Sequence, residues 1–133
     1  MIDRMMGRGN GSILIKASDL GINEMSKQAY ATACEKGFRD AGVAESRGIL
    51  GDLMLIVTEV AEAAEEVRNP EFSATRTYYR KKDRKPEGLP AELADIIIRI
   101  GDLAGSLGID LSAAVVEKMK FNKTRPRLHG KTC

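Results

Sequence analysis

The fold is decided by residues 49–68, which read ILGDLMLIVTEVAEAAEEVR. Apolar residues recur there at steps of three and four, the pattern of a helix with one buried face. That face comprises Ile49, Leu53, Ile56, Val60, Ala64 and Val67, and it is widened by Leu50, Met54, Val57 and Ala61. We therefore expect a helix over residues 46–68 that packs against more than one partner and ends at Asn69-Pro70.

One further helix is expected on either side of this one. The preceding helix covers residues 23–36, with Asn23 as its N-cap and Gly37 as a left-handed stop. The following helix opens near Pro90, a residue suited to the first helical turn, and stops at Gly108. Leucine and isoleucine at helical spacing give this second neighbour an apolar face for packing.

A fourth helix and three less regular segments complete the expected organisation. The helix follows Asp110, which is a good N-cap residue. Residues 1–22 are expected to form a flexible N-terminal extension, residues 70–88 a basic loop, and residues 125–133 a basic C-terminal tail. The sequence thus predicts an all-α fold in which four main helices form a bundle over residues 23–124.

The composition is typical of one small globular domain. The chain has 133 residues, of which 43% are hydrophobic and 30% charged, so a disordered chain is not expected. Aromatic residues make up only 5% and Trp is absent, so the core must be aliphatic. A domain of this size leaves much apolar surface exposed and therefore gains from pairing with another copy.

Composition also limits the partners and the location that we expect. The net charge of +2 is too small to argue for nucleic acid, which is an unlikely partner. No apolar stretch is long enough to span a membrane or to form a signal-peptide core, so we expect a cytoplasmic protein without a membrane partner. Cys34 and Cys133 are too few for a disulfide framework or a zinc site, and we expect Cys34 to be buried.

Two pairs of acidic residues are the candidates for chemistry. Glu59 and Glu62 are three residues apart on one predicted helix, and Glu92 and Asp95 are three apart on the next, so each pair shares a face. If these helices pack antiparallel, the four carboxylates approach one another, which is costly unless a cation neutralises them. Mg²⁺ prefers oxygen ligands and suits carboxylates combined with substrate phosphate. The pattern favours attack of a metal-activated water on a phosphoanhydride.

The spacing alone leaves a second interpretation open. Glutamates at helical spacing are also typical of a solvated face that makes weak ion pairs, and Arg99 lies one turn after Asp95 and could pair with it. One detail favours a site. Asp95 directly precedes the apolar residues 96–98, and Glu59 lies just after residues 55–57, so both carboxylates are expected to be partly desolvated.

The ordered motifs resemble a known family. Glu59-x-x-Glu62 and Glu92-x-x-Asp95, each on an aliphatic helix, are similar to the MazG-like all-α nucleoside triphosphate pyrophosphohydrolases. The end of the chain is also similar, and it reads Lys118-Met119-x-x-Asn122-x-x-Arg125-Pro126-x-x-His129-Gly130-Lys131. The resemblance covers about residues 24–131 and implies a helical bundle completed by homo-oligomerisation, as a homodimer or homotetramer.

The resemblance also implies an activity and its residues. It implies hydrolysis of a nucleoside triphosphate to the monophosphate and pyrophosphate, with Mg²⁺, or alternatively Mn²⁺, as cofactor. The implied metal ligands are Glu59, Glu62, Glu92 and Asp95, among which Glu62 and Asp95 are the expected catalytic residues. The implied substrate-binding residues are Phe38, which would stack on the base, and Lys118, Asn122 and Arg125, which would contact phosphate or sugar.

Two features depart from the family, and other functions remain open. Some relatives carry a water-activating Glu where this chain has Thr58, so a motif carboxylate or the metal alone must activate water. The connection between Glu62 and Glu92 has 29 residues, which is long for the family; it is either a lid over a triphosphate or a surface loop. Phe38 is either a base-stacking or a core residue. The alternative functions are phosphoribosyl-ATP pyrophosphohydrolase, or a non-catalytic helical module that regulates or binds nucleic acid.

Overall fold

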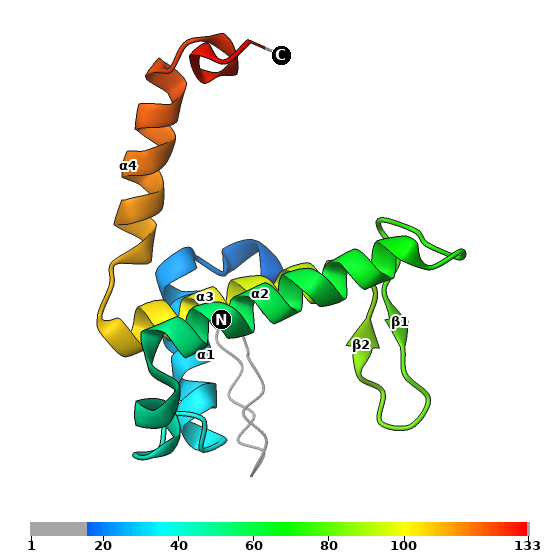
Figure 1. Cartoon of the computed structure of the whole chain (residues 1–133). Coiled ribbons are helices and arrows are strands. Elements are labelled where there is room, and N and C mark those ends of the chain that lie inside the picture. Colours follow the sequence, from blue (N-terminus) through cyan, green and yellow to red (C-terminus); the bar gives the residue numbers. More distant parts are fainter. Residues whose placement is uncertain (1–15, 133) are drawn as a thin grey trace.

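The computed structural model describes residues 16–132, and this part of the chain is mostly helical (Figure 1). Its helices are α1 (Ile22–Glu35), α2 (Val43–Arg68), α3 (Leu89–Leu107) and α4 (Leu111–Thr124), with short 3-10 helices at Ala17–Asp19 and Arg127–Gly130. Two short strands, β1 (Tyr78–Tyr79) and β2 (Pro86–Glu87), pair antiparallel. The all-α class with four main helices is therefore confirmed. Residues 1–15, where most of the expected flexible extension falls, and residue 133 lie outside the described residues.

Helix α3 is the centre of the arrangement, because it packs against both α1 and α2 (Figure 1). The Ser26 hydroxyl donates a 2.6 Å hydrogen bond to the Gly101 carbonyl, so α1 and α3 approach closely. A Cβ atom added at Gly105 would lie 2.7 Å from the Cβ of Tyr30. The two glycines thus allow a backbone approach that any larger residue would prevent. Helix α2 runs antiparallel to α3, as the motif interpretation requires.

The helix ends were predicted in part. Gly108 adopts the left-handed conformation after α3, and the Asp110 side chain accepts a 3.0 Å hydrogen bond from the Ala113 amide, so both predicted caps are confirmed. The prediction that Asn23 caps α1 is wrong, since α1 begins at Ile22. The Asn23 amide instead accepts from the Ser112 amide and donates to Asp110, both at 2.9 Å, and thereby ties the start of α4 to α1.

Helix α2 begins three residues before the predicted start and contains a break. Gly48 has φ 63° and ψ −179°, which are not helical angles, so a short first segment from Val43 is bent away from the long segment after it. Only glycine adopts such angles without strain. The predicted end is confirmed, since Asn69 is the C-cap with extended backbone.

We predicted a basic loop over residues 70–88. In the structure this segment contains the β1–β2 hairpin. The Tyr78 hydroxyl donates a 2.9 Å hydrogen bond to Glu66, which fastens the hairpin to the end of α2. Gly88, with φ 103°, passes so close to the Arg76 carbonyl that a Cβ would lie 2.5 Å from it. The sequence pattern hid the hairpin because its strands are only two residues long.

A single chain buries little apolar surface. Among the described residues the buried hydrophobic side chains are Ala63 and Ala104, and no large side chain is fully buried. Cys34 is exposed, so the expectation that it is buried is wrong. Large apolar residues of α2 and α3 that remain exposed are Val43, Ile49, Leu50, Leu53, Met54, Val57, Val60, Val67, Leu93, Ile97, Ile98, Ile100 and Leu107. None of the helices in the described part has the length and apolar character needed to cross a bilayer.

Candidate functional site

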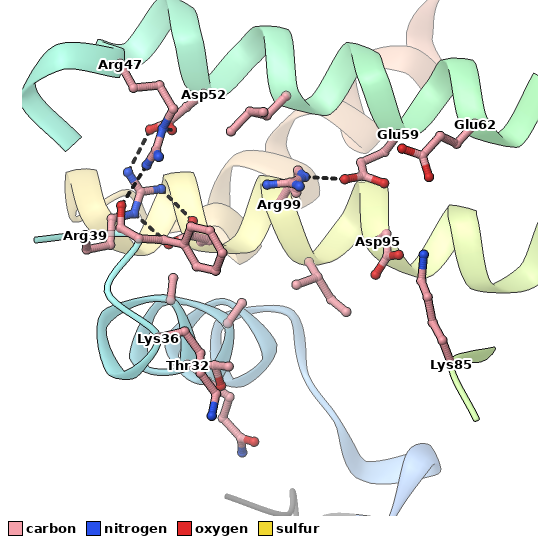
Figure 2. A pocket seen from close by; sticks show the side chains of 17 residues that line it. Thr32, Lys36, Arg39, Arg47, Asp52, Glu59, Glu62, Lys85, Asp95 and Arg99 are labelled. Atoms are coloured by element: carbon pink, nitrogen blue, oxygen red, sulfur yellow. Dashed lines mark hydrogen bonds and ion pairs between the residues drawn. The ribbon is translucent and has the colours of Figure 1, made fainter. Parts of the chain in front are cut away.

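A pocket of about 540 Å³ lies between α1, α2, α3 and the end of the hairpin (Figure 2). This volume is within the range of small-molecule sites. One end of the pocket is acidic and the other end carries an arginine-aspartate network. The residues that line the pocket include Phe38, Arg39, Asp52, Glu59, Glu62, Lys85, Asp95 and Arg99.

The acidic end brings together residues of both predicted motifs. One carboxylate oxygen from each of Glu59, Glu62 and Glu92 lies within 4.8 Å of the others. Glu59 and Glu92 are buried, whereas Glu62 is exposed. Asp95 lines the pocket one turn along α3 but is not part of the three-residue cluster, whereas Glu92 belongs to the cluster without lining the pocket. The antiparallel packing of α2 on α3 produces this convergence, because it places Glu62 opposite the start of α3.

The cluster is electrostatically incomplete within the described residues. Glu92 is only 4% exposed, and its Oε2 atom has no hydrogen-bond partner. Burial raises the pKa of Glu92 above its ordinary value, and the nearby charge of Glu62 adds to this shift. Burial also raises the pKa of Asp95, with a further contribution from Glu59. Burying a carboxylate oxygen without a partner costs free energy of folding. This end of the pocket is therefore suited to a cation that prefers oxygen ligands.

Arg99 partly compensates the acidic end. Its Nε donates a 2.5 Å hydrogen bond to Oε1 of Glu59, across the interface between α3 and α2 (Figure 2). The alternative that Arg99 pairs with Asp95 is therefore wrong for the described structure. The Arg99 side chain is 40% exposed and lines the pocket, so it can also contact a bound anion.

The opposite end of the pocket is organised by Arg39, which the sequence analysis missed. Arg39 donates two hydrogen bonds to Asp102, of 2.9 and 2.7 Å, and a third of 2.7 Å to Asp52. Arg47 donates a fourth bond to Asp52, of 2.5 Å. The network joins the turn after α1 to α2 and α3, and all four side chains are at least four-fifths buried. Nothing in the spacing of these residues points to it, because its members lie on three separate elements.

This network fixes the charge of its members. Burial alone would raise the pKa of Asp52, but hydrogen bonds from Arg39 and then Arg47 hold that pKa below its ordinary value. The hydrogen bonds to Asp102 raise the pKa of Arg39 despite its burial. Arg39 and Asp52 therefore stay charged at neutral pH, which suits the network to hold the three elements together.

Phe38 lies on the rim of the pocket and is not a core residue. Its side chain is 57% exposed and lines the pocket beside the Arg39 network. The Arg47 guanidinium donates a 3.0 Å hydrogen bond to the Phe38 carbonyl, which positions this turn. An exposed aromatic face at the mouth of a polar pocket is suited to stacking on a planar ring.

The other expected substrate-binding residues are not brought to the pocket within one chain. Lys118, Asn122 and Arg125 belong to α4 and its C-terminal end, and α4 projects away from the other helices (Figure 1). Helix α4 contacts α1, and none of the three residues lines the pocket. The Lys118 ammonium lies 5.6 Å from the centre of the Phe121 ring instead.

Thr58 stands where some members of the family that the motifs resemble carry a water-activating Glu. Its hydroxyl donates a 2.6 Å hydrogen bond to the Leu55 carbonyl of its own helix, so it is not directed at the carboxylates. Comparison with known proteins does not identify a relative: no protein-family model, curated protein or solved structure matches the chain.

Proposed function

We propose that the protein is a magnesium-dependent pyrophosphohydrolase of nucleoside triphosphates. The observation that carries the proposal is the convergence of Glu59, Glu62 and Glu92, together with the unpartnered buried oxygen of Glu92. Surface ion pairs do not leave a buried carboxylate without a partner, so this arrangement argues against the interpretation as a solvated face. The family resemblance of the two motifs supports the same activity.

The residues present fit a hard divalent cation. Glu59, Glu62 and Glu92 would supply carboxylate oxygens, and Asp95, which lines the pocket one turn along α3, would complete the set through its own oxygen or a water. Held by these residues, a Mg²⁺ ion would polarise phosphoryl oxygens and lower the pKa of a bound water. Glu62, the exposed member, and Asp95, which lines the pocket, are the carboxylates placed to accept a proton from the attacking water. Water adds to phosphorus as the bond between the α and β phosphates breaks, which releases monophosphate and pyrophosphate.

The remainder of the pocket fits the remainder of a nucleotide. Phe38, which lines the pocket beside the Arg39 network, would stack on the base, and Arg99 would face the phosphates. The Arg39 network would hold the Phe38 turn at a fixed distance from α2 and α3. This orientation places the base and the triphosphate at the two chemically different ends of one pocket.

We further propose that the working unit is a homo-oligomer, as a dimer or tetramer. The support is the row of exposed apolar residues on α2 and α3, which a soluble monomer rarely displays over such a length. A second copy would cover this row and complete the bundle. It would also allow Lys118, Asn122 and Arg125 to reach the pocket of a neighbouring copy, which they do not do in their own chain.

The decisive experiment is a pyrophosphate-release screen with purified protein. The panel contains the natural and modified nucleoside triphosphates together with phosphoribosyl-ATP, and each is tested with Mg²⁺, with Mn²⁺ and with a chelator. We expect release of pyrophosphate and a monophosphate from at least one nucleotide, and only with metal. Absence of release across the panel with either metal would overturn the enzymatic function and leave a binding or regulatory module.

A further inference from the structure

The basic segment of the hairpin presents a single cation to the pocket. Six basic residues occur between positions 76 and 85, namely Arg76, Arg80, Lys81, Lys82, Arg84 and Lys85. Most of them are engaged or point outward. Arg76 and Arg84 lie over the Tyr78 and Tyr79 rings, at 6.0 and 5.0 Å, and Arg80 pairs with Asp83. Lys81 and Lys82 are exposed, whereas Lys85 is half-buried and lines the pocket.

The backbone of the hairpin holds Lys85 in place. The Lys85 carbonyl accepts a 2.9 Å hydrogen bond from the Arg80 amide, and the Lys85 amide donates one of 3.2 Å to Asp83. Strand β2 follows directly and packs against α3. In Figure 2 the Lys85 side chain extends from the hairpin toward Asp95, with Glu62 beyond it. A flexible loop would not keep one lysine at this position.

Lys85 is close to the carboxylates without forming an ion pair. Within residues 16–132, no carboxylate lies within ion-pair distance of its ammonium group. Its positive charge nevertheless affects the pKa values of the nearby carboxylates. Burial raises the pKa values of Glu92 and Asp95, and the positive charge of Lys85 opposes both shifts. The ammonium group therefore faces the site with its hydrogen-bond donors uncommitted to protein carboxylates.

We propose that Lys85 binds the phosphate chain of the substrate, and that the hairpin thereby selects polyphosphates over monophosphates. This inference rests on the proposed function. The four carboxylates with Arg99 and Lys85 carry a net charge of −2, which one divalent cation neutralises. A triphosphate then adds three to four negative charges to a neutral site. Lys85 and Arg99 are the cations that line the pocket beside these carboxylates, on two different elements.

Nucleotide binding tests this role directly, with the full-length protein and Mg²⁺. Isothermal titration would compare the α,β-imido analogues of the common deoxyribonucleoside triphosphates with the corresponding monophosphates. We expect Lys85→Ala to weaken binding of the best triphosphate analogue about tenfold, the size of one lost charge-assisted contact. Monophosphate affinity should change by less than a factor of about two, and Lys85→Arg should recover most of the loss. Lys82→Ala, at an exposed lysine of the same hairpin, is the matched control.

The possible outcomes separate this inference from the proposed function. Equal loss of triphosphate and monophosphate affinity, or triphosphate affinity unchanged in Lys85→Ala, would overturn the role of Lys85. Mn²⁺ binding without nucleotide, followed by electron paramagnetic resonance, should be retained in the variant. A drop there would mean that Lys85 only supports the metal site. A wild-type protein that binds neither Mn²⁺ nor any analogue would overturn the proposed function itself.

Discussion

Individual carboxylates at the acidic end differ in how far their charge is compensated within the described chain. Glu92 is buried and its Oε2 atom has no hydrogen-bond partner, whereas Glu59 forms an ion pair with Arg99. The sequence allowed the motif residues to be predicted, because spacing of three places them on one helical face. It did not reveal that Asp95 stands apart from the other three, since this depends on the relative rotation of α2 and α3.

The catalytic proposal predicts the effect of single substitutions. Glu62→Gln and Asp95→Asn should each lower kcat by about a hundredfold or more, because a metal ligand or proton acceptor is removed with little change of shape. Helical content by circular dichroism should not change. Glu65→Gln is the control, since the Glu65 side chain is 68% exposed and pairs with Arg68 on the outer surface. Full activity in both motif variants would place the reaction elsewhere.

The raised pKa values of Glu92 and Asp95 predict the pH dependence of stability without metal. Between the ordinary values, 4.5 and 3.8, and the raised ones, the folded chain binds more protons than the unfolded chain. In the presence of EDTA, its free energy of unfolding should therefore fall as pH rises above these ordinary values and through the raised ones. Asp52, whose pKa is lowered, stabilises the fold above its ordinary value of 3.8, and this contribution is lost only below that pH.

Thermal unfolding measures this dependence. Tm in EDTA should decrease toward neutral pH, and saturating Mg²⁺ should reverse the decrease by binding the folded state. Glu92→Gln should flatten the profile in EDTA, because the variant has no carboxyl to ionise at this position. A Tm that rises steadily from pH 4.5 to 7 in EDTA, with no response to Mg²⁺, would contradict the expectation that ionising these buried carboxylates destabilises the fold.

At the scale of elements, α3 connects everything that forms the pocket. The sequence predicted its limits well, since Pro90 and Gly108 mark a first turn and a stop. It did not predict the hairpin, whose strands are too short for a periodic pattern, or the Arg39 network, whose members are scattered over α2, α3 and a turn. Contacts between elements carry no local pattern, so they became visible only in the structure.

The Arg39 network predicts a stability difference between two neighbouring aspartates. Asp52→Ala removes one acceptor and leaves Arg39 and Arg47 with less compensation, which should cost about 3 kcal/mol, the range for breaking a buried pair. Asp40→Ala, at an exposed aspartate without an ion pair among the described residues, should cost less than about 0.5 kcal/mol. Urea unfolding gives both values. Equal effects would show that the network does not hold the elements together.

The close approach of α1 to α3 predicts that Gly105 is intolerant of a side chain. Alanine favours helix by about 1 kcal/mol over glycine, so an unconstrained site would become more stable. Here the new Cβ would lie 2.7 Å from the Tyr30 Cβ, and the overpacking should cost about 1–3 kcal/mol. We therefore expect Gly105→Ala to lower Tm. An increase in Tm would show that α1 can shift away from α3 at little cost.

At the scale of the whole molecule, the described chain buries few apolar side chains on its own. Helix α2 packs against α3 and is tied to the hairpin at Glu66, but many of its apolar side chains remain exposed. The sequence predicted that this helix needs more than one partner. It also predicted that the fourth helix joins a bundle, but within the described chain α4 projects away from the other helices, and its apolar residues Val116, Met119 and Phe121 remain exposed.

A charge placed in the exposed apolar row should therefore disrupt the assembly. Val57 is 54% exposed on α2, and Val57→Glu would bury an unpaired carboxylate if a second copy covers this row. We expect light scattering with size-exclusion chromatography to give a dimer or tetramer for the wild type and a smaller species for the variant. Lys27→Glu, at an exposed residue of α1, should leave the mass unchanged.

The wild type offers a second readout that does not depend on the folding of Val57→Glu. Its Tm should rise with protein concentration, since assembly stabilises only the folded state. A monomeric mass together with a concentration-independent Tm would mean that the exposed row has no second copy against it, and Lys118, Asn122 and Arg125 would then have no route to a pocket.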